Sequence, residues 1–324
     1  SLKSNGYGLG AEPVARVLQA CGVTSFAVGS VRDAQVIRQV LPDAKILLYG
    51  GVLAVNASVV AEGQFTVTLS NEQDIVQWHA VSCRPQECFL KIDVGLDRFG
   101  FTLEDLDSLS RYSTQLRDLN ITGVYTHMTG DDPEMPDWAT QRTRFESALA
   151  VCERQLPHLR VHCAASSDQV LRSGRYDYNC VDVGGALFGI RDQGPRSHQP
   201  LRHALAAIKS RVTSVKAVGT DRYLPDQVER IGIVRFGWGD GYPRHHTVDA
   251  FALVNGKQTP IVGPIHLEHM RVDLTDRDDV SVGDEVTFLG TQGAEMITPE
   301  NLTVQWGLDG IDHLYGNLRS HLPT

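Results

Sequence analysis

Short apolar runs alternate with amphipathic stretches from the start of the chain to the glycine pair at 184–185. The runs are rich in Val, Ile, Leu and Phe and predict buried strands, and the spacing of apolar residues between them predicts helices. The predicted strands are a stub ending at Lys3 and residues 25–28, 45–49, 65–69, 88–93, 121–125, 159–162 and 178–183. The predicted helices include residues 11–18, 31–40, 73–79, 103–116, 138–154 and 167–172.

Eight predicted strands alternating with helices favour a (β/α)8 barrel over a doubly wound sheet. We predict that this α/β barrel occupies residues 1–195, and that a loop-like break at 194–200 ends it. In such barrels the chemistry collects where the strands end.

The pattern then changes to strands separated by turn signals such as Asn255-Gly256. This arrangement predicts a mostly-β C-terminal domain over residues 203–324. Its predicted strands are residues 208–218, 229–236, 251–254, 261–274, 284–289 and 302–306.

Composition narrows the class of protein. With 324 residues, 42% of them hydrophobic, the chain can bury a large core, and its net charge of −9 argues against binding to nucleic acid or anionic membranes. It contains no apolar run of membrane-spanning length, and we expect no secretory signal. The six cysteines are scattered without metal-binding spacing, which predicts reduced thiols in a cytoplasmic protein. The twelve histidines lack a third ligand at a recognisable spacing, so no metal site is expected.

Lys3 stands where the stub meets a glycine-rich turn. Lysine forms imines with carbonyl cofactors, although a surface lysine is the plainer alternative. Gly184-Gly185 leaves backbone N–H groups open to a phosphate, and Ser166 either adds a hydroxyl or caps the next helix. The residue types at the strand ends therefore suit a phosphorylated aldehyde cofactor. They are Lys3, Tyr7, Lys91, Arg98, His127, His162, Ser166, Asp182, Gly184 and Gly185.

Six motifs follow one another along the chain: KSNGYGLG at 3–10, KIDVGLDRFG at 91–100, YTHM at 125–128, HCAAS at 162–166, GWGDGYPR at 237–244 and GDEV at 283–286. In content and order they resemble the motifs of the alanine racemase family. The first is similar to the family's cofactor-lysine motif K-A-N-A-Y-G-H-G. The resemblance implies a pyridoxal 5'-phosphate (PLP) enzyme, a barrel followed by a β domain, and a homodimer with shared active sites. Because the family's chains begin a few dozen residues earlier, this one is expected to lack a first strand and helix.

The resemblance also implies roles for individual residues. Lys3 would bind the cofactor and act as the base on one face of the substrate Cα. Arg98 would lie near the cofactor's phenolic oxygen and the substrate carboxylate, with Lys91 beside it, in some members as a carbamate. The alternatives are ion pairs of Lys91 and Arg98 with Asp93 or Asp97, and satisfied core histidines. The remaining implied contacts are to the phosphate, from Tyr7, Ser166, Gly184 and Gly185, and around the ring, from His127 and His162.

Trp238 stands where the family has its second catalytic base, a tyrosine that reaches the opposite face of Cα from the partner subunit. An indole donates a hydrogen bond but cannot accept the Cα proton. Two-base racemisation through this residue is therefore lost. Tyr242 and His246 are close in sequence and are candidates to replace it.

Asp182 stands where the family places an arginine against the pyridine nitrogen. A carboxylate there favours a protonated nitrogen and a stronger electron sink, which suits aldol cleavage, decarboxylation, transamination or elimination. The alternative is that the alignment slips and Asp182 pairs with Arg172 or Arg175.

Two further departures concern the substrate and the phosphate. The family's Met-Asp segment for the substrate carboxylate reads Leu267-Glu268, and its final tyrosine is absent, with Ser320 nearest. The pocket is therefore not expected to be alanine-shaped.

The sequence favours an amino-acid racemase acting on a small amino acid. A one-base lyase, aldolase or decarboxylase on the same fold stays open, as does a PLP-binding homologue without catalysis. A heterodimer with a tyrosine-bearing partner is a further possibility.

Overall fold

The first half of the chain builds a parallel sheet whose six strands follow one another in sequence order. The computed structural model describes residues 1–82, 86–129, 137–156, 158–165, 167, 178–190, 201–219, 224–245, 249–308 and 311–318. The strands are β1 (Ser25–Val28), β2 (Lys45–Leu48), β3 (Thr66–Leu69), β4 (Glu87–Ile92), β5 (Asn120–His127) and β6 (Val161–Ala165).

Hydrogen bonds continue this sheet beyond both of its edge strands. At β6, the Cys180 N–H donates to His162 O (3.2 Å) and Cys180 forms a parallel bridge with Cys163. At β1, the Leu2 N–H donates to Ala27 O (2.8 Å), and the Ser1 nitrogen donates to Val183 O (2.8 Å). The stub and the 178–183 segment thus link the two edges through single hydrogen bonds, although neither is a regular strand as predicted.

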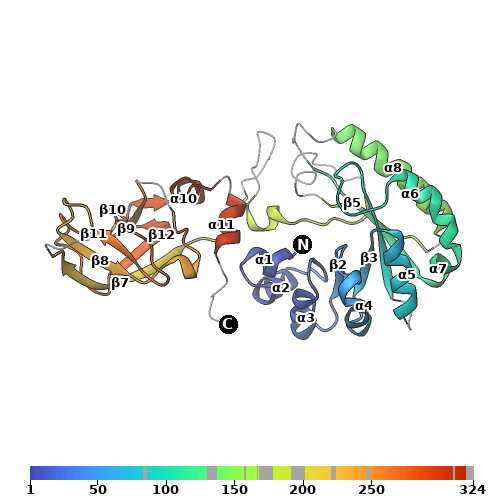
Figure 1. The fold of residues 1–324 in the computed structure, drawn as a ribbon, viewed down its shortest axis with the longest axis horizontal. Helices are drawn as coiled ribbons and strands as arrows, with labels where there is room; N and C mark the ends of the chain where they lie inside the picture. The colour runs from blue at the N-terminus through green and yellow to red at the C-terminus, as the bar shows by residue number, and fades with distance from the viewer. Residues whose placement is uncertain are drawn as a thin grey trace. The chain divides into compact units, whose positions relative to one another are not determined.

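Helices lie along the outside of the sheet (Figure 1). Side-chain caps start four of them where the sequence has Ser30, Asn71, Thr102 and Asp137. The helix predicted at 103–116 is broken in the middle by a 3-10 turn, η1 (Leu109–Tyr112), and of the one predicted at 167–172 only Ser167 is described. The helices are α2 (Ala11–Ala20), α3 (Val31–Val40), α4 (Leu53–Glu62), α5 (Glu72–Val81), α6 (Leu103–Ser108), α7 (Ser113–Asp118) and α8 (Trp138–Gln155).

The second half forms an antiparallel sheet of seven strands, in the order β10-β9-β12-β7-β8-β11 with β13 beside β12. Asn255 and Gly256 both have positive φ (49° and 69°) and turn β9 back into β10, a strand the sequence did not predict. The strands are β7 (Ile208–Ala217), β8 (Arg230–Val234), β9 (Phe251–Val254), β10 (Lys257–Pro260), β11 (Met270–Asp273), β12 (Glu285–Gln292) and β13 (Glu295–Ile297). A parallel sheet with outer helices followed by a β unit confirms the predicted fold class.

The strand predicted at 302–306 is wrong, because these residues lie in helix α10 (Pro299–Trp306). Thr298 caps the helix, Pro299 begins it, and Gly307 ends it with a left-handed φ of 63°. These start and stop signals outweigh the β-branched residues inside it. Helix α11 (Ile311–Asn317) follows.

The chain divides into two compact units, one containing Ser1–Leu187 and the other Phe188–Ile190 with Arg202–Thr324. Among the described residues, no helix is both long and apolar enough to span a bilayer.

Candidate active site

Lys3 begins a turn with left-handed backbone, labelled α1 (Lys3–Tyr7). Ser4, Asn5 and Tyr7 have φ of 50°, 56° and 56°. L-residues adopt this left-handed conformation at an energetic cost, and such residues cluster at functional sites. The Asn5 N–H donates to the buried Asp33 (3.2 Å), and the Asn5 side chain accepts from the Ala11 N–H at the start of α2 (2.8 Å). Neighbouring helices therefore hold this turn in place.

The turn brings Tyr7 against Gly184. A Cβ on Gly184 would lie 2.3 Å from the Tyr7 hydroxyl oxygen, so any other residue there would displace this hydroxyl. The Ser167 hydroxyl accepts from the N–H groups of Gly184 and Ala186, at 3.2 Å each, beside the short turn η2 (Gly185–Phe188). Hydroxyls and backbone N–H groups thus meet where the sequence predicts a phosphate site, although the Gly184 N–H is bonded to Ser167 rather than open as predicted. Ser166 itself lies outside the described residues.

Two tyrosines that the sequence analysis did not select lie beside the lysines. The Lys3 ammonium is 4.6 Å from the centre of the Tyr49 ring, and the Lys91 ammonium is 5.2 Å from that of Tyr125. The two ring centres are 6.4 Å apart, and the Tyr125 hydroxyl shares a 3.0 Å hydrogen bond with Thr68. Tyr49 ends an apolar run and is followed by Gly50-Gly51, just as Lys3 ends the stub before a glycine-rich turn.

Asp182 belongs to this cluster. Its carboxylate accepts a hydrogen bond from the Tyr49 hydroxyl, which is also 3.0 Å from the Ser1 hydroxyl. Burial, followed by the Asp182 charge, holds the pKa of Tyr49 well above its usual value, so Tyr49 stays a donor. The predicted partners Arg172 and Arg175 lie outside the described residues.

Lys91 and His127 have strongly shifted pKa values. Lys91 is 7% exposed, and burial, reinforced by the Arg98 charge, lowers its pKa to about 8. Burial lowers the pKa of His127 to about 3, with further lowering from the charges of Lys3, Lys91 and Arg98. The effect of these charges places the side chains of Lys3, Lys91, Arg98 and His127 near one another, and it keeps His127 a neutral imidazole at physiological pH.

Arg98 lies in an exposed loop shaped by Asp93. The Asp93 carboxylate accepts from the N–H groups of Gly95 (2.9 Å), Leu96 (2.8 Å) and Arg98 (3.0 Å). Asp93 therefore acts chiefly on the backbone of this loop.

His162 is not brought together with the others. Its Nε2 lies 3.7 Å from Glu153 of α8, whereas the next residue, Cys163, packs against Tyr125. Successive side chains of a strand point to opposite faces, so with Cys163 inward His162 faces the helices. The expected position of His162 around the cofactor ring does not match this arrangement.

In the second unit Trp238 begins the turn η3 (Trp238–Asp240) and is 36% exposed. Its backbone N–H donates to His266 O (3.0 Å), and the Arg244 guanidinium lies 5.4 Å from the centre of the indole ring. Tyr242 is 1% exposed and packs edge-on against Phe236 and Trp306. Tyr242 therefore cannot serve as the missing base. His246 lies outside the described residues.

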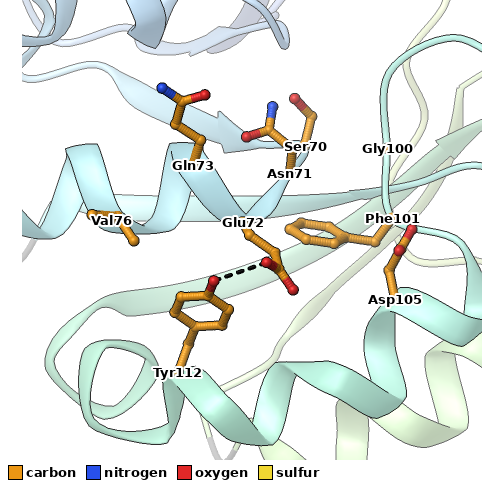
Figure 2. A pocket seen from close by; sticks show the side chains of 9 residues that line it. All are labelled: Ser70, Asn71, Glu72, Gln73, Val76, Gly100, Phe101, Asp105 and Tyr112. Carbon is orange, nitrogen blue, oxygen red and sulfur yellow. Dashed lines mark hydrogen bonds between the residues drawn. The ribbon is translucent and has the colours of Figure 1, made fainter.

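A separate cavity of about 610 Å³ opens where β3 ends and α5 begins (Figure 2). On its wall the Tyr112 hydroxyl donates to the Glu72 carboxylate, 2.8 Å away, and Figure 2 marks this hydrogen bond with a dashed line. None of the predicted site residues lines it.

Comparison with known families decides the assignment. The alanine racemase N-terminal domain matches residues 1–192, and the alanine racemase C-terminal domain matches residues 205–315. The chain belongs to the alanine racemase family. This family consists of PLP-dependent isomerases.

Relatives cover most of the chain. The alanine racemase of Symbiobacterium thermophilum is 31% identical over 320 residues, which span 93% of this chain and 83% of that protein. The alanine racemase of Carboxydothermus hydrogenoformans is 30% identical over 311 residues, spanning 92% and 84%.

Solved structures share the fold. Alanine racemase from E. faecalis has a TM-score of 0.84 at 25% identity, covering 98% of this chain and 87% of that one. Alanine racemase from Bartonella henselae, which has covalently bound pyridoxal phosphate, has a TM-score of 0.80 at 23% identity, covering 98% and 89%.

The described residues fit the family's cofactor. The contact of the Tyr7 hydroxyl with Gly184 supports this fit, because a side chain at position 184 would displace that hydroxyl from the place where hydroxyls and N–H groups converge. Lys3, Tyr7, Gly184 and Gly185 would hold the cofactor, with Arg98, His127 and Asp182 around it.

This fit predicts the effect of Gly184→Ala. The added methyl group displaces the Tyr7 hydroxyl, so affinity for PLP should fall about tenfold or more, in line with the loss of one or two good hydrogen bonds. Titration with PLP followed by absorbance measures it. Gly29→Ala is the matched control, because a Cβ there meets nothing within 4 Å. Equal affinity in the two variants would contradict the phosphate assignment.

The low pKa of Lys91 predicts a pH effect on stability. Between its folded value of about 8 and its ordinary 10.5, the unfolded chain holds a proton that the folded chain has released. The free energy of unfolding of the wild type should therefore rise over this window relative to Lys91→Met, by up to about 3 kcal/mol. Urea unfolding from pH 7.5 to 10.5 measures it, and parallel curves for the two proteins would show an ordinary pKa.

Proposed function

We propose that this chain is a PLP-dependent racemase of a small amino acid, with Lys3 as the base on one face of Cα. The observation that carries this proposal is the strained turn that starts at Lys3 and sets its amine beside Tyr49 in the cluster with Lys91, His127 and Asp182. Bound PLP supplies the electron sink that makes the Cα proton acidic.

Each residue of the cluster has a distinct role in this proposal. Lys3 holds and returns a proton at its Nζ. Neutral His127 adds no positive charge beside that amine, while Arg98 and Lys91 offer cations to the substrate carboxylate. Asp182, whose carboxylate accepts from the Tyr49 hydroxyl, would be the negative partner of the cofactor ring.

Racemisation also needs a base on the opposite face of Cα. Trp238 cannot accept a proton, and Tyr242 is buried in the core. These two observations favour, as a second candidate, a one-base lyase, aldolase or decarboxylase that uses Lys3 alone.

Exchange in D2O distinguishes the candidates. The PLP-loaded protein is incubated with single enantiomers of alanine, serine and larger amino acids, and products are separated on a chiral column with mass detection. Deuterium with inversion supports the racemase. Deuterium with retention, or a cleaved product, supports one-face chemistry, and neither signal despite bound PLP would point to a non-catalytic homologue.

We also propose a cytoplasmic homodimer with shared active sites, and domains at 1–195 and 203–324. Membership of the family supports the dimer, and the division into two units supports the domains. Light scattering gives the oligomeric state, and a monomer that turns over substrate would contradict a shared site.

A further inference from the structure

Cys163 and Cys180 face each other at the edge of the parallel sheet. Cys163 lies in β6 and is 3% exposed, and Cys180 is its partner in a parallel bridge. The Cys180 N–H donates to His162 O (3.2 Å), which fixes the register of the pair. Paired positions of neighbouring strands lie about 4.8 Å apart, within the Cα separations of about 4.4–6.8 Å that disulfides span.

We infer that Cys163 and Cys180 form a reversible disulfide when the protein meets a peroxide, and that this bond shifts the segment that carries Asp182 in the candidate active site. This is a modification site separate from the residues assigned to the chemistry. It goes beyond the proposed function.

The two thiols differ from the other described cysteines. A hydrogen bond from the Cys163 thiol lowers the pKa of Cys180, which is also partly exposed. Burial instead raises the pKa of Cys88 and of Cys152 to about 12 each. Since the thiolate is the reactive form, Cys180 is the first point of attack and Cys163 the resolving thiol.

The chemistry balances with one peroxide. The Cys180 thiolate attacks a peroxide oxygen, the O–O bond breaks, and hydroxide leaves and takes up a proton to form water. The Cys163 sulfur then displaces the hydroxyl of the sulfenic acid, which leaves as a second water. Two thiols are oxidised to a disulfide, the peroxide is reduced, and a dithiol reductant reverses the change.

The disulfide would affect the candidate active site because both cysteines pack against its aromatic residues. Cys163 is buried against Tyr125, and Tyr49, Phe89 and Cys180 pack on this pair. Tyr49 in turn holds Asp182, two residues beyond Cys180. A new bond between the sulfur atoms therefore pulls on the segment that carries Asp182.

Peptide mapping tests the bond directly. Trypsin places Cys163 in residues 161–172 and Cys180 in residues 176–191. After hydrogen peroxide treatment of the PLP-loaded protein, mass spectrometry should find these peptides joined, and dithiothreitol should separate them. Oxidation of the exposed Cys21 without any joined 161–172 and 176–191 peptides would overturn the inference.

PLP absorbance and turnover are measured on the same peroxide-treated samples. The absorbance of bound PLP and the turnover should fall several-fold with the bond and return on reduction, while Cys180→Ser and Cys163→Ala should keep their values in peroxide. Circular dichroism confirms that both variants are folded. A wild type that forms the bond with unchanged absorbance and turnover, or variants that lose both as the wild type does, would overturn the effect on the site.

Discussion

Replacing Lys3 with alanine is expected to abolish the visible absorbance of covalently bound PLP and to lower turnover by about a thousandfold or more, because both the covalent anchor and the base are removed. The strained turn makes this prediction specific to Lys3. Ser4, Asn5 and Tyr7 hold left-handed backbone, and the turn that they form places the amine of Lys3 4.6 Å from the centre of the Tyr49 ring.

The matched control is Lys45→Ala, because Lys45 is an exposed lysine of the same unit. It should keep the absorbance and the turnover. Borohydride reduction followed by peptide mapping adds a readout independent of activity, since the PLP adduct should fall on Lys3 alone. A wild-type spectrum in Lys3→Ala would refute the assignment of the site.

Local signals made much of the fold predictable. Caps such as Ser30 and Asn71, and the Asn255-Gly256 turn, act within a few residues, so they can be read from the sequence. The error at 302–306 had a local remedy too, since Thr298-Pro299 is a helix start.

The site was less predictable where it depends on contacts between distant segments. The Tyr49–Asp182 hydrogen bond joins residues 133 positions apart, and the Cys163–Cys180 bridge depends on strand register. His162 shows the same limit, because a motif places a residue in the chain but not on a face of its strand.

The carboxylate of Asp182 bears on whether the reaction is racemisation or bond cleavage. It accepts from the buried Tyr49 hydroxyl, so the carboxylate is fixed within the cluster. Under the proposed function, a carboxylate held beside the ring nitrogen would strengthen the electron sink and so favour proton loss and bond cleavage alike. The choice between racemase and lyase therefore depends on whether a second proton carrier is present.

Trp238→Tyr is expected to raise racemisation about a hundredfold or more over the wild type, the usual contribution of one general base, if the second base alone is missing. The position can accept the change, because Trp238 is partly exposed, its backbone N–H is bonded to His266 O, and a tyrosine ring can still lie against the Arg244 guanidinium. Chiral chromatography of alanine incubated with each protein measures the rate. Trp138→Tyr is the control, since it makes the same substitution at another partly exposed tryptophan.

The double variant Trp238→Tyr with Asp182→Arg separates the two departures from the family. If Asp182 also opposes racemisation, the double variant should exceed the single one, because restoring a cation beside the ring limits cleavage and transamination as side reactions. If Trp238→Tyr alone gives no gain and the double variant none either, the missing tyrosine is not what limits proton transfer. A wild type that already inverts alanine would then require another acceptor near Trp238, and the imidazoles of His266 and His269, stacked 4.7 Å apart on the loop that accepts the Trp238 N–H, are the first to replace with glutamine.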